Sequence, residues 1–219
     1  MSSTITDTAA VSHVVVGFLQ ENCYVVDDGQ GGVCLVDPGS SWPVIEEAVA
    51  GRKVSLVLVT HFHDDHVGAL NDVIKATGAP WVAGAYDAVM LSPGHRDLPG
   101  VTLPPVARHT PKQTFMGGET VEAGARSFQV IPCPGHSRGG MSYYEPTLGV
   151  VFSGDTLFAG TAGRTDLYGG YHRDLLGSLV SLSKLPAETL VFPGHGPSTT
   201  IGAEVASNPF VREALGLRG

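Results

Sequence analysis

The segment Thr-His-Phe-His-Asp-Asp-His at residues 60–66 follows a continuous apolar run at residues 54–59. That run is rich in Val and Leu, as expected of a strand buried on both faces of a sheet. The segment places three histidines and two aspartates within seven residues, directly before a predicted helix at 69–76 that ends at Gly78. Imidazole nitrogens and carboxylate oxygens are ligands that zinc and similar metals prefer. We therefore expect a strand that ends in a metal-binding loop.

Apolar strand segments alternate with helical segments along the first half of the chain, which predicts α/β layering. The predicted strands cover residues 11–16, 23–26, 33–36, 54–59 and 81–83. The predicted helices cover residues 43–50, with a Ser40 or Ser41 cap and Pro43 in the first turn, 69–76 and 86–91. Residues 92–118 are rich in Pro and Gly, and we interpret them as an irregular excursion over the rim of the site.

A second β-rich half begins near Glu119. Its predicted elements are a strand at 126–131, a hairpin formed by 141–145 and 149–152, a helix at 171–185, a strand at 189–192 and a short closing helix within 208–219. Three of these strands run into a Gly followed by a potential ligand, namely His136 in PCPGHS, Asp155 in VFSGDT and His195 in VFPGHG. Glycine allows the sharp bend that places such a side chain at the end of a strand.

The candidate metal ligands number seven: His61, His63, Asp65, His66, His136, Asp155 and His195. Seven donors exceed what one four-coordinate ion takes, but they suit two metals that share a carboxylate and a bridging water. Two metals about 3.5–4 Å apart can lower the pKa of such a water to near neutrality. The pattern therefore predicts hydrolytic chemistry.

Composition excludes several other classes of protein. The net charge of −8 and the absence of basic runs argue against a nucleic-acid or membrane-surface binder. Apolar runs are far shorter than the roughly 20 residues that cross a bilayer. The three cysteines show no CxxC spacing, so we expect no disulfide framework. The first ten residues lack the pattern of a signal peptide, and we expect a cytoplasmic protein with one domain over residues 1–219.

The motifs resemble those of the metallo-β-lactamase-fold hydrolases, and within them the glyoxalase II (hydroxyacylglutathione hydrolase) group of the short bacterial type. The resemblance covers nearly the whole chain, through Asn22-Cys23-Tyr24, VDPG at 36–39, THxHxDH, PGHS, SGDTLF, PGHG and the ending TTIG…NPF. It implies an αββα sandwich of two mixed sheets flanked by helices, with a dinuclear site at their shared edge. The helical C-terminal domain of larger glyoxalase II enzymes is not expected, and Pro197 replaces a tyrosine of those enzymes.

The resemblance also implies a role for each candidate ligand. His61, His63 and His136 would hold the first metal, and Asp65, His66 and His195 the second, with Asp155 bridging them. Asp37 would hold a ligand loop by hydrogen bonds, and Asp64 would be solvated. Zinc is the expected metal, with iron or manganese as alternatives.

The implied reaction is hydrolysis of a thioester such as S-D-lactoylglutathione, or of another acyl low-molecular-weight thiol, by a monomer or homodimer. A metal-bridging hydroxide would attack the carbonyl carbon, with Asp65 and Asp155 as the catalytic carboxylates. Arg164, nine residues after Asp155, would face the thiol carrier, unless it forms an internal salt bridge with Asp166. Tyr168 and Tyr171 are weaker candidates for substrate contacts.

Several alternatives remain open. A persulfide dioxygenase of the same fold would hold one iron through His61, His136 and Asp155, although that branch has an Asp where this chain has Gly196. A lactonase, a β-lactamase and a non-catalytic binding module are further possibilities. Cys133 is either an extra ligand or nucleophile, or a buried structural thiol. Phe18 and Leu19 form either an apolar lip of the site or part of the core.

Overall fold

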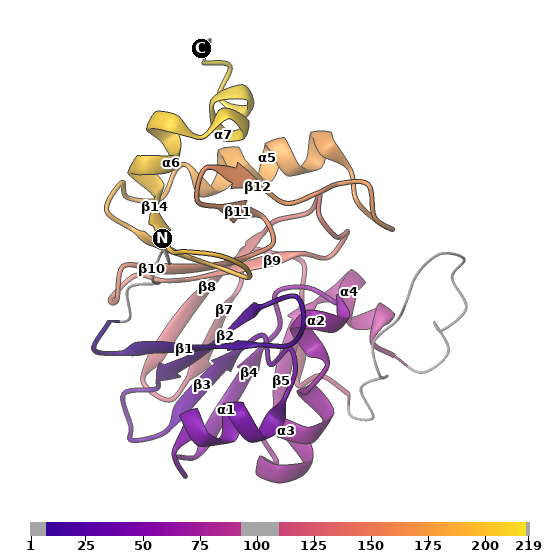
Figure 1. Ribbon diagram of the computed structural model, residues 1–219, viewed down its shortest axis with the longest axis vertical. Coiled ribbons are helices and arrows are strands. Elements are labelled where there is room, and N and C mark those ends of the chain that lie inside the picture. Colours follow the sequence, from indigo (N-terminus) through magenta and orange to yellow (C-terminus); the bar gives the residue numbers. More distant parts are fainter. Residues whose placement is uncertain (1–7, 93–109, 218–219) are drawn as a thin grey trace.

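The computed structural model describes residues 8–92 and 110–217. Two six-stranded sheets pack face to face, with helices on the outer face of each (Figure 1). This arrangement confirms the αββα architecture.

The first sheet holds the N-terminal half of the chain, in the spatial order β1-β2-β3-β4-β5-β6. Its strands are β1 (Val11–Val16), β2 (Glu21–Asp27), β3 (Val33–Val36), β4 (Val54–Leu58), β5 (Trp81–Gly84) and β6 (Gln113–Phe115). Strands β1 to β3 are antiparallel, whereas β3 to β6 run parallel. Parallel pairing brings the carboxyl ends of β3 and β4 to one edge.

The second sheet holds the C-terminal half, in the spatial order β14-β13-β10-β9-β8-β7. Its strands are β7 (Thr120–Ala123), β8 (Arg126–Pro132), β9 (Met141–Glu145), β10 (Val150–Gly154), β13 (Leu190–Pro193) and β14 (Thr199–Thr200). Strands β10 and β13 pair in parallel, so the turns that follow them also meet. A separate two-stranded ribbon comprises β11 (Leu157–Phe158) and β12 (Thr161–Ala162).

The helices cover the two outer faces. They are α1 (Trp42–Val49), α2 (Asp64–Val67), α3 (Leu70–Thr77), α4 (Ala85–Met90), α5 (His172–Leu182), α6 (Ile201–Ser207) and α7 (Pro209–Ala214). Helices α1 and α3 lie outside the first sheet, and α5, α6 and α7 lie outside the second (Figure 1).

Three apolar clusters correspond to the three interfaces between these layers. Alternate residues of β3 show the sorting: Leu35 packs toward α1 and α3, whereas Val36 packs into the middle cluster between the sheets. The middle cluster also contains Phe152 and Phe192, whose rings stack with centroids 5.6 Å apart. The central strands of each sheet are therefore buried on both faces, as the continuous apolar runs predict, whereas the edge strands β1 and β7 are partly exposed.

The predicted elements are found with small shifts of their ends, and the differences lie in short elements. The four-residue helix α2 lies inside the histidine-rich segment, and β6 lies within the predicted excursion, whose residues 93–109 fall outside the described range. The sequence does not indicate helix α6 either, because its seven residues include Gly202 and show little apolar periodicity. Ser41 precedes α1 but makes no capping hydrogen bond, because its backbone is left-handed with φ of 57°. Within the described residues, no helix is long and apolar enough to cross a membrane.

Candidate metal centre

Five polar turns meet at the edge shared by the two sheets. Asp37 follows β3, the segment 60–66 follows β4, and His136, Asp155 and His195 follow β8, β10 and β13. The carboxyl ends of parallel strands commonly form such sites in α/β folds. The seven candidate donors, far apart in sequence, are thereby brought together.

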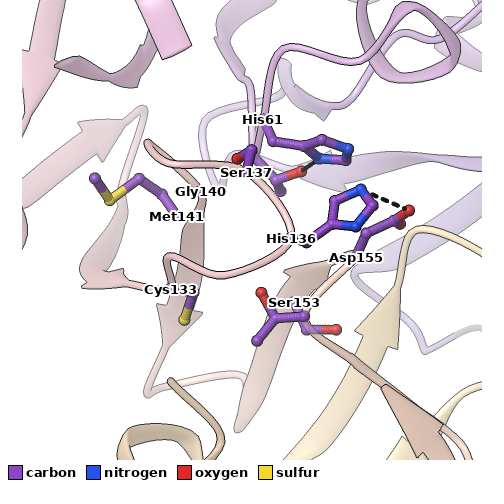
Figure 2. Close-up of a pocket in the computed structure, with 10 residues that line it drawn as sticks. His61, Cys133, His136, Ser137, Gly140, Met141, Ser153 and Asp155 are labelled. Atoms are coloured by element: carbon purple, nitrogen blue, oxygen red, sulfur yellow. Dashed lines mark hydrogen bonds and ion pairs between the residues drawn. The ribbon is translucent and has the colours of Figure 1, made fainter. Parts of the chain in front are cut away.

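The first group of donors comprises His61, His63 and His136, whose ligand atoms lie within 4.8 Å of one another. His63 Nδ1 faces His136 Nε2 at 2.8 Å. Figure 2 shows the His61 and His136 rings and the Asp155 carboxylate converging, while the Cys133 thiol lies apart from them. Burial lowers the pKa of His63 to about 4, and the neighbouring His136 adds to this shift. Burial also lowers the pKa of His61 and His136, so all three rings are neutral near pH 7, which is the form that binds a metal.

The second group comprises Asp65, His66 and His195. His195 Nε2 lies 3.1 Å from Asp65 Oδ2 and 3.3 Å from His66 Nε2. His66 is fully buried, whereas His195 and Asp65 are partly exposed. The second group therefore lies on the solvent side of the centre.

Asp155 lies between the two groups. Its Oδ2 is 3.5 Å from His136 Nε2 and 3.7 Å from His195 Nε2, and its Oδ1 is 3.3 Å from His66 Nε2. Burial alone would raise the pKa of this carboxyl, but the surrounding histidines hold it well below its usual range. Asp155 is therefore placed as a bridging ligand would be.

Asp37 orients His66 directly and His61 through the Thr60 hydroxyl. His66 Nδ1 lies 2.9 Å from Asp37 Oδ2 and donates to it, which leaves Nε2 facing the centre. Thr60 donates its hydroxyl to the same Asp37 oxygen at 2.5 Å, and that hydroxyl lies 3.0 Å from His61 Nδ1. Metal-binding histidines commonly hold their second nitrogen in this way, because the contact fixes the tautomer and the ring orientation.

Backbone carbonyls hold two more rings. His136 Nδ1 donates to Arg164 O at 2.8 Å, and His195 Nδ1 donates to Leu19 O at 3.1 Å. In both rings Nε2 is left facing the centre. Four of the five histidines thus have one nitrogen engaged by the protein, which leaves the other nitrogen available for a metal.

Two buried atoms of the centre have no hydrogen-bond partner, namely His61 Nε2 and Asp155 Oδ1. Buried polar atoms are nearly always paired, so such orphans call for an explanation. Divalent cations at the two donor groups would satisfy both atoms, and nitrogen and carboxylate donors suit zinc, iron or manganese. The residues present therefore fit a pair of divalent metals.

The turn that carries His195 is held by the first sheet. Asn22 donates from Nδ2 to Pro193 O and to Gly196 O, both at 3.0 Å, and the Tyr24 hydroxyl donates to Pro193 O at 2.6 Å. These contacts explain the presence of Asn22 and Tyr24 in the motif at the start of β2. They join one half of the chain to a ligand from the other half.

Asp87 on α4 is a supporting residue that the sequence did not indicate. Its buried carboxylate accepts from the backbone N–H of Phe62 at 3.1 Å, the Ser137 hydroxyl at 2.7 Å and the Gly139 N–H at 2.6 Å. It therefore joins the loop of His61 and His63 to the loop of His136. A single aspartate in a predicted helix gives no pattern from which this contact could be inferred.

The candidate substrate contacts are partly accounted for by other interactions. Arg164 forms a two-point salt bridge with Asp166, with both N–O distances at 2.7 Å. This is the internal pairing that the sequence left as the alternative for Arg164. Tyr168 and Tyr171 are about half exposed on the same loop.

The side chains of Phe18, Leu19 and Asp64 are all exposed in the structure. Phe18 is 98% exposed and Leu19 is 60% exposed, so they project from the turn beside His195 and are not part of the core. Asp64 is exposed, as expected.

Cys133 is a buried thiol, and Ser142 donates its hydroxyl to the sulfur at 3.1 Å. Burial raises the pKa of this thiol to about 11. A thiol that remains protonated is a poor nucleophile and a poor metal ligand. Cys23 and Cys34 are likewise buried and free, in agreement with the predicted lack of a disulfide framework.

The chain matches a known protein family and is similar to a relative of known name. Residues 16–195 match the model of the family described as the metallo-beta-lactamase superfamily. Hydroxyacylglutathione hydrolase GloC of Haemophilus influenzae is 30% identical over 197 residues, which cover 88% of this chain and 93% of GloC.

Two solved structures resemble the chain over nearly their whole length. BLEG-1, described as a B3 metallo-beta-lactamase, superposes with a TM-score of 0.83 and 32% identity, covering 92% of this chain and 99% of BLEG-1. TTHA1623, in a di-iron-bound form, gives a TM-score of 0.78 and 38% identity, covering 91% of this chain and 99% of TTHA1623.

Proposed function

The chain belongs to the metallo-beta-lactamase superfamily, and from this premise we propose that it is a dinuclear metallo-hydrolase that cleaves acyl thioesters of a low-molecular-weight thiol. S-D-lactoylglutathione represents this class of substrate in the experiments proposed below. The observation that carries the proposal is the convergence of two three-residue donor groups on Asp155. The similarity to GloC supports the thioester as the bond that is cleaved.

The ligand assignment follows the two donor groups. His61, His63 and His136 would hold one metal, Asp65, His66 and His195 the other, and Asp155 would contact both. When bound, two such cations supply a hydroxide at neutral pH and polarise a carbonyl oxygen. The similar TTHA1623 carries two irons, so iron stands beside zinc and manganese as a candidate.

The side chains of the protein perform the remaining tasks. Asp65 is the more exposed of the two catalytic carboxylates, and it would orient the hydroxide that the cations supply. Asp155 and the buried His66 contact each other, and this contact would keep both ligands in position. Phe18 and Leu19, exposed beside His195, offer an apolar surface that would exclude water once substrate is bound. Cys133 is buried and its pKa is raised to about 11, so its protonated thiol is a poor nucleophile and is given no role in the reaction.

A second candidate function is hydrolysis of a β-lactam, which the similarity to BLEG-1 favours. Both reactions add hydroxide to a carbonyl, so the donor groups alone accommodate either. Oxidation of a persulfide would require only His61, His136 and Asp155. It gives no role to the convergence of Asp65, His66 and His195, and thioester hydrolysis is therefore preferred.

The test combines metal analysis with a panel of substrates. Purified protein should contain about two equivalents of divalent metal, and should release thiol from S-D-lactoylglutathione. Asp155→Asn keeps the shape of the side chain but removes its charge, and should abolish turnover and reduce the metal content.

Asp64→Asn is the matched control, because Asp64 lies in the same loop but is solvent-exposed. It should retain wild-type turnover. Thioesterase activity in metal-free protein would contradict the proposal. Oxygen uptake on glutathione persulfide with one iron would favour the dioxygenase, and preferential cleavage of cephalosporins would favour the β-lactamase.

A further inference from the structure

A hollow opens beside the first donor group. It has a volume of about 180 Å³, and its lining consists of Phe62, Tyr86, Asp87, Val89, Met90, Arg138, Tyr168 and Gly169. Most of these side chains are apolar or aromatic. The volume is smaller than that of a pocket for a complete drug-sized ligand, so the hollow suits one end of a longer molecule.

The hollow is attached to the metal centre through two loops. Phe62 stands between His61 and His63, and its ring centroid lies 4.7 Å from that of His63. Arg138 is two residues beyond His136 on the second loop. A molecule bound at the donor groups could therefore extend into the hollow.

Arg138 supplies a positive charge at this position. Its guanidinium lies 4.4 Å from the centroid of the Tyr86 ring, a distance typical of a cation–π contact. The side chain is exposed, and within residues 8–92 and 110–217 no ion pair neutralises it. The Tyr86 ring limits the mobility of the guanidinium without using its N–H donors.

The one acidic residue of the lining is engaged by groups other than Arg138. Asp87 directs its carboxylate at the Phe62 and Gly139 amides and the Ser137 hydroxyl, which occupy both of its oxygens. Arg164 differs in this respect, because Asp166 already engages it at two points. Arg138 is thus better placed than Arg164 to meet an incoming anion.

We propose that this hollow binds the anionic end of the thiol carrier, with Arg138 pairing to a carboxylate or phosphate and Tyr86, Val89, Met90 and Tyr168 packing on the adjoining carbon chain. The inference rests on the proposed thioesterase function and adds the specificity of the same site. A guanidinium pairs bidentately with either anion, so both a peptide thiol and a phosphorylated thiol fit the chemistry.

Equilibrium binding of non-hydrolysable thioethers tests the hollow independently of turnover. The probes are S-hexylglutathione, which carries carboxylates, S-hexyl-coenzyme A, which carries phosphates, and neutral S-hexyl-N-acetylcysteamine. Wild-type protein should bind at least one anionic probe more tightly than the neutral probe, and added salt should weaken the difference. Which anionic probe binds identifies the class of carrier.

Arg138→Met should weaken binding of the preferred anionic probe by about 10- to 100-fold, as expected for loss of a hydrogen-bonded charge pair. It should leave binding of the neutral probe unchanged. Arg138→Lys should retain part of the affinity, because lysine keeps the positive charge but cannot form the two-point contact of a guanidinium. Lys75→Met removes a charge from α3, on the far side of the first sheet, and should bind all probes as the wild type does.

Equal binding of the anionic probes by Arg138→Met and wild type would overturn the inference. A loss confined to Arg164→Met would also overturn it, as would an equal loss for the neutral probe. The two proposals fail separately. Selective anion binding without turnover of any thioester would contradict only the thioesterase function, whereas turnover with no effect of Arg138 would contradict only the role of the hollow.

Discussion

Gly194 immediately precedes His195, and its backbone lies against the side chains of Asp155 and His66. A Cβ atom at this position would stand 2.4 Å from Asp155 Oδ1 and 2.5 Å from His66 Cε1, well inside the contact distance of carbon and oxygen. The glycine before His195 is therefore required for the approach of the other ligands. It has a steric role beyond that of bending the chain.

Gly194→Ala should displace Asp155 or His66, lower the metal content and reduce kcat/KM by about 100-fold, the cost of misplacing a catalytic group by roughly 1 Å. Metal analysis and thioester kinetics on the same preparation measure both effects. Gly177→Ala is the control, because no atom lies within 4 Å of a Cβ at that exposed position of α5. It should leave both quantities unchanged and raise helix stability by up to about 1 kcal/mol. Full metal content in Gly194→Ala would contradict the steric argument.

Single residues differ in how well the sequence predicts them. The candidate ligands in THFHDDH can be recognised from their residue types and spacing, and the structure brings these donors together. Arg138 and Asp87 could not be predicted, because each acts on partners that only the tertiary fold brings near. Asp37 lies between these cases: its motif was recognisable, but its simultaneous contacts to Thr60 and His66 were not visible in the sequence.

At the scale of elements, the long periodic segments were predictable and the short ones were not. Strands β3 and β4 have enough apolar residues to be recognised, whereas β6, β11, β12 and β14 contain only two or three residues each. Such short strands are defined by their hydrogen-bonded neighbours. Helix α2 is equally hard to predict, because its single turn lies inside the segment of candidate metal ligands.

Helix α4 positions Asp87, and this produces a pH dependence of stability. Burial raises the pKa of the Asp87 carboxyl to about 6, although three hydrogen bonds from Ser137, Gly139 and Phe62 oppose the shift. In the unfolded chain the pKa is about 3.9. Between these values the folded protein keeps a proton that the unfolded chain has lost, so the free energy of unfolding falls as pH rises through this range.

Asp87→Asn cannot titrate at this position and should remove that part of the pH dependence. The advantage of the wild type over the variant should be largest near pH 4 and should shrink by up to about 3 kcal/mol by pH 7. Urea unfolding of both metal-free proteins measures the difference, and metal-free protein avoids the contribution of ligand binding. A difference that stays constant with pH would show that folding does not raise the pKa of Asp87.

At the scale of the whole molecule, the centre requires both halves of the chain. One sheet supplies His61, His63, Asp65 and His66, and the other supplies His136, Asp155 and His195. The two halves are joined independently of any metal, through the middle apolar cluster and through hydrogen bonds such as that from Tyr143 to Val59 O at 2.8 Å. The metals would therefore occupy a frame that is already folded.

Removal of metal by a chelator should accordingly abolish thioester hydrolysis while the protein stays folded at 25 °C. Far-UV circular dichroism should keep its amplitude, because the three apolar clusters do not depend on the ligands. The melting temperature should fall, because a ligand that binds only the folded state stabilises it by RT ln(1 + [L]/Kd). Adding back zinc, iron(II) or manganese in separate samples should restore both properties and rank the metals. Collapse of the circular dichroism signal on chelation would instead show that metal binding holds the two halves together.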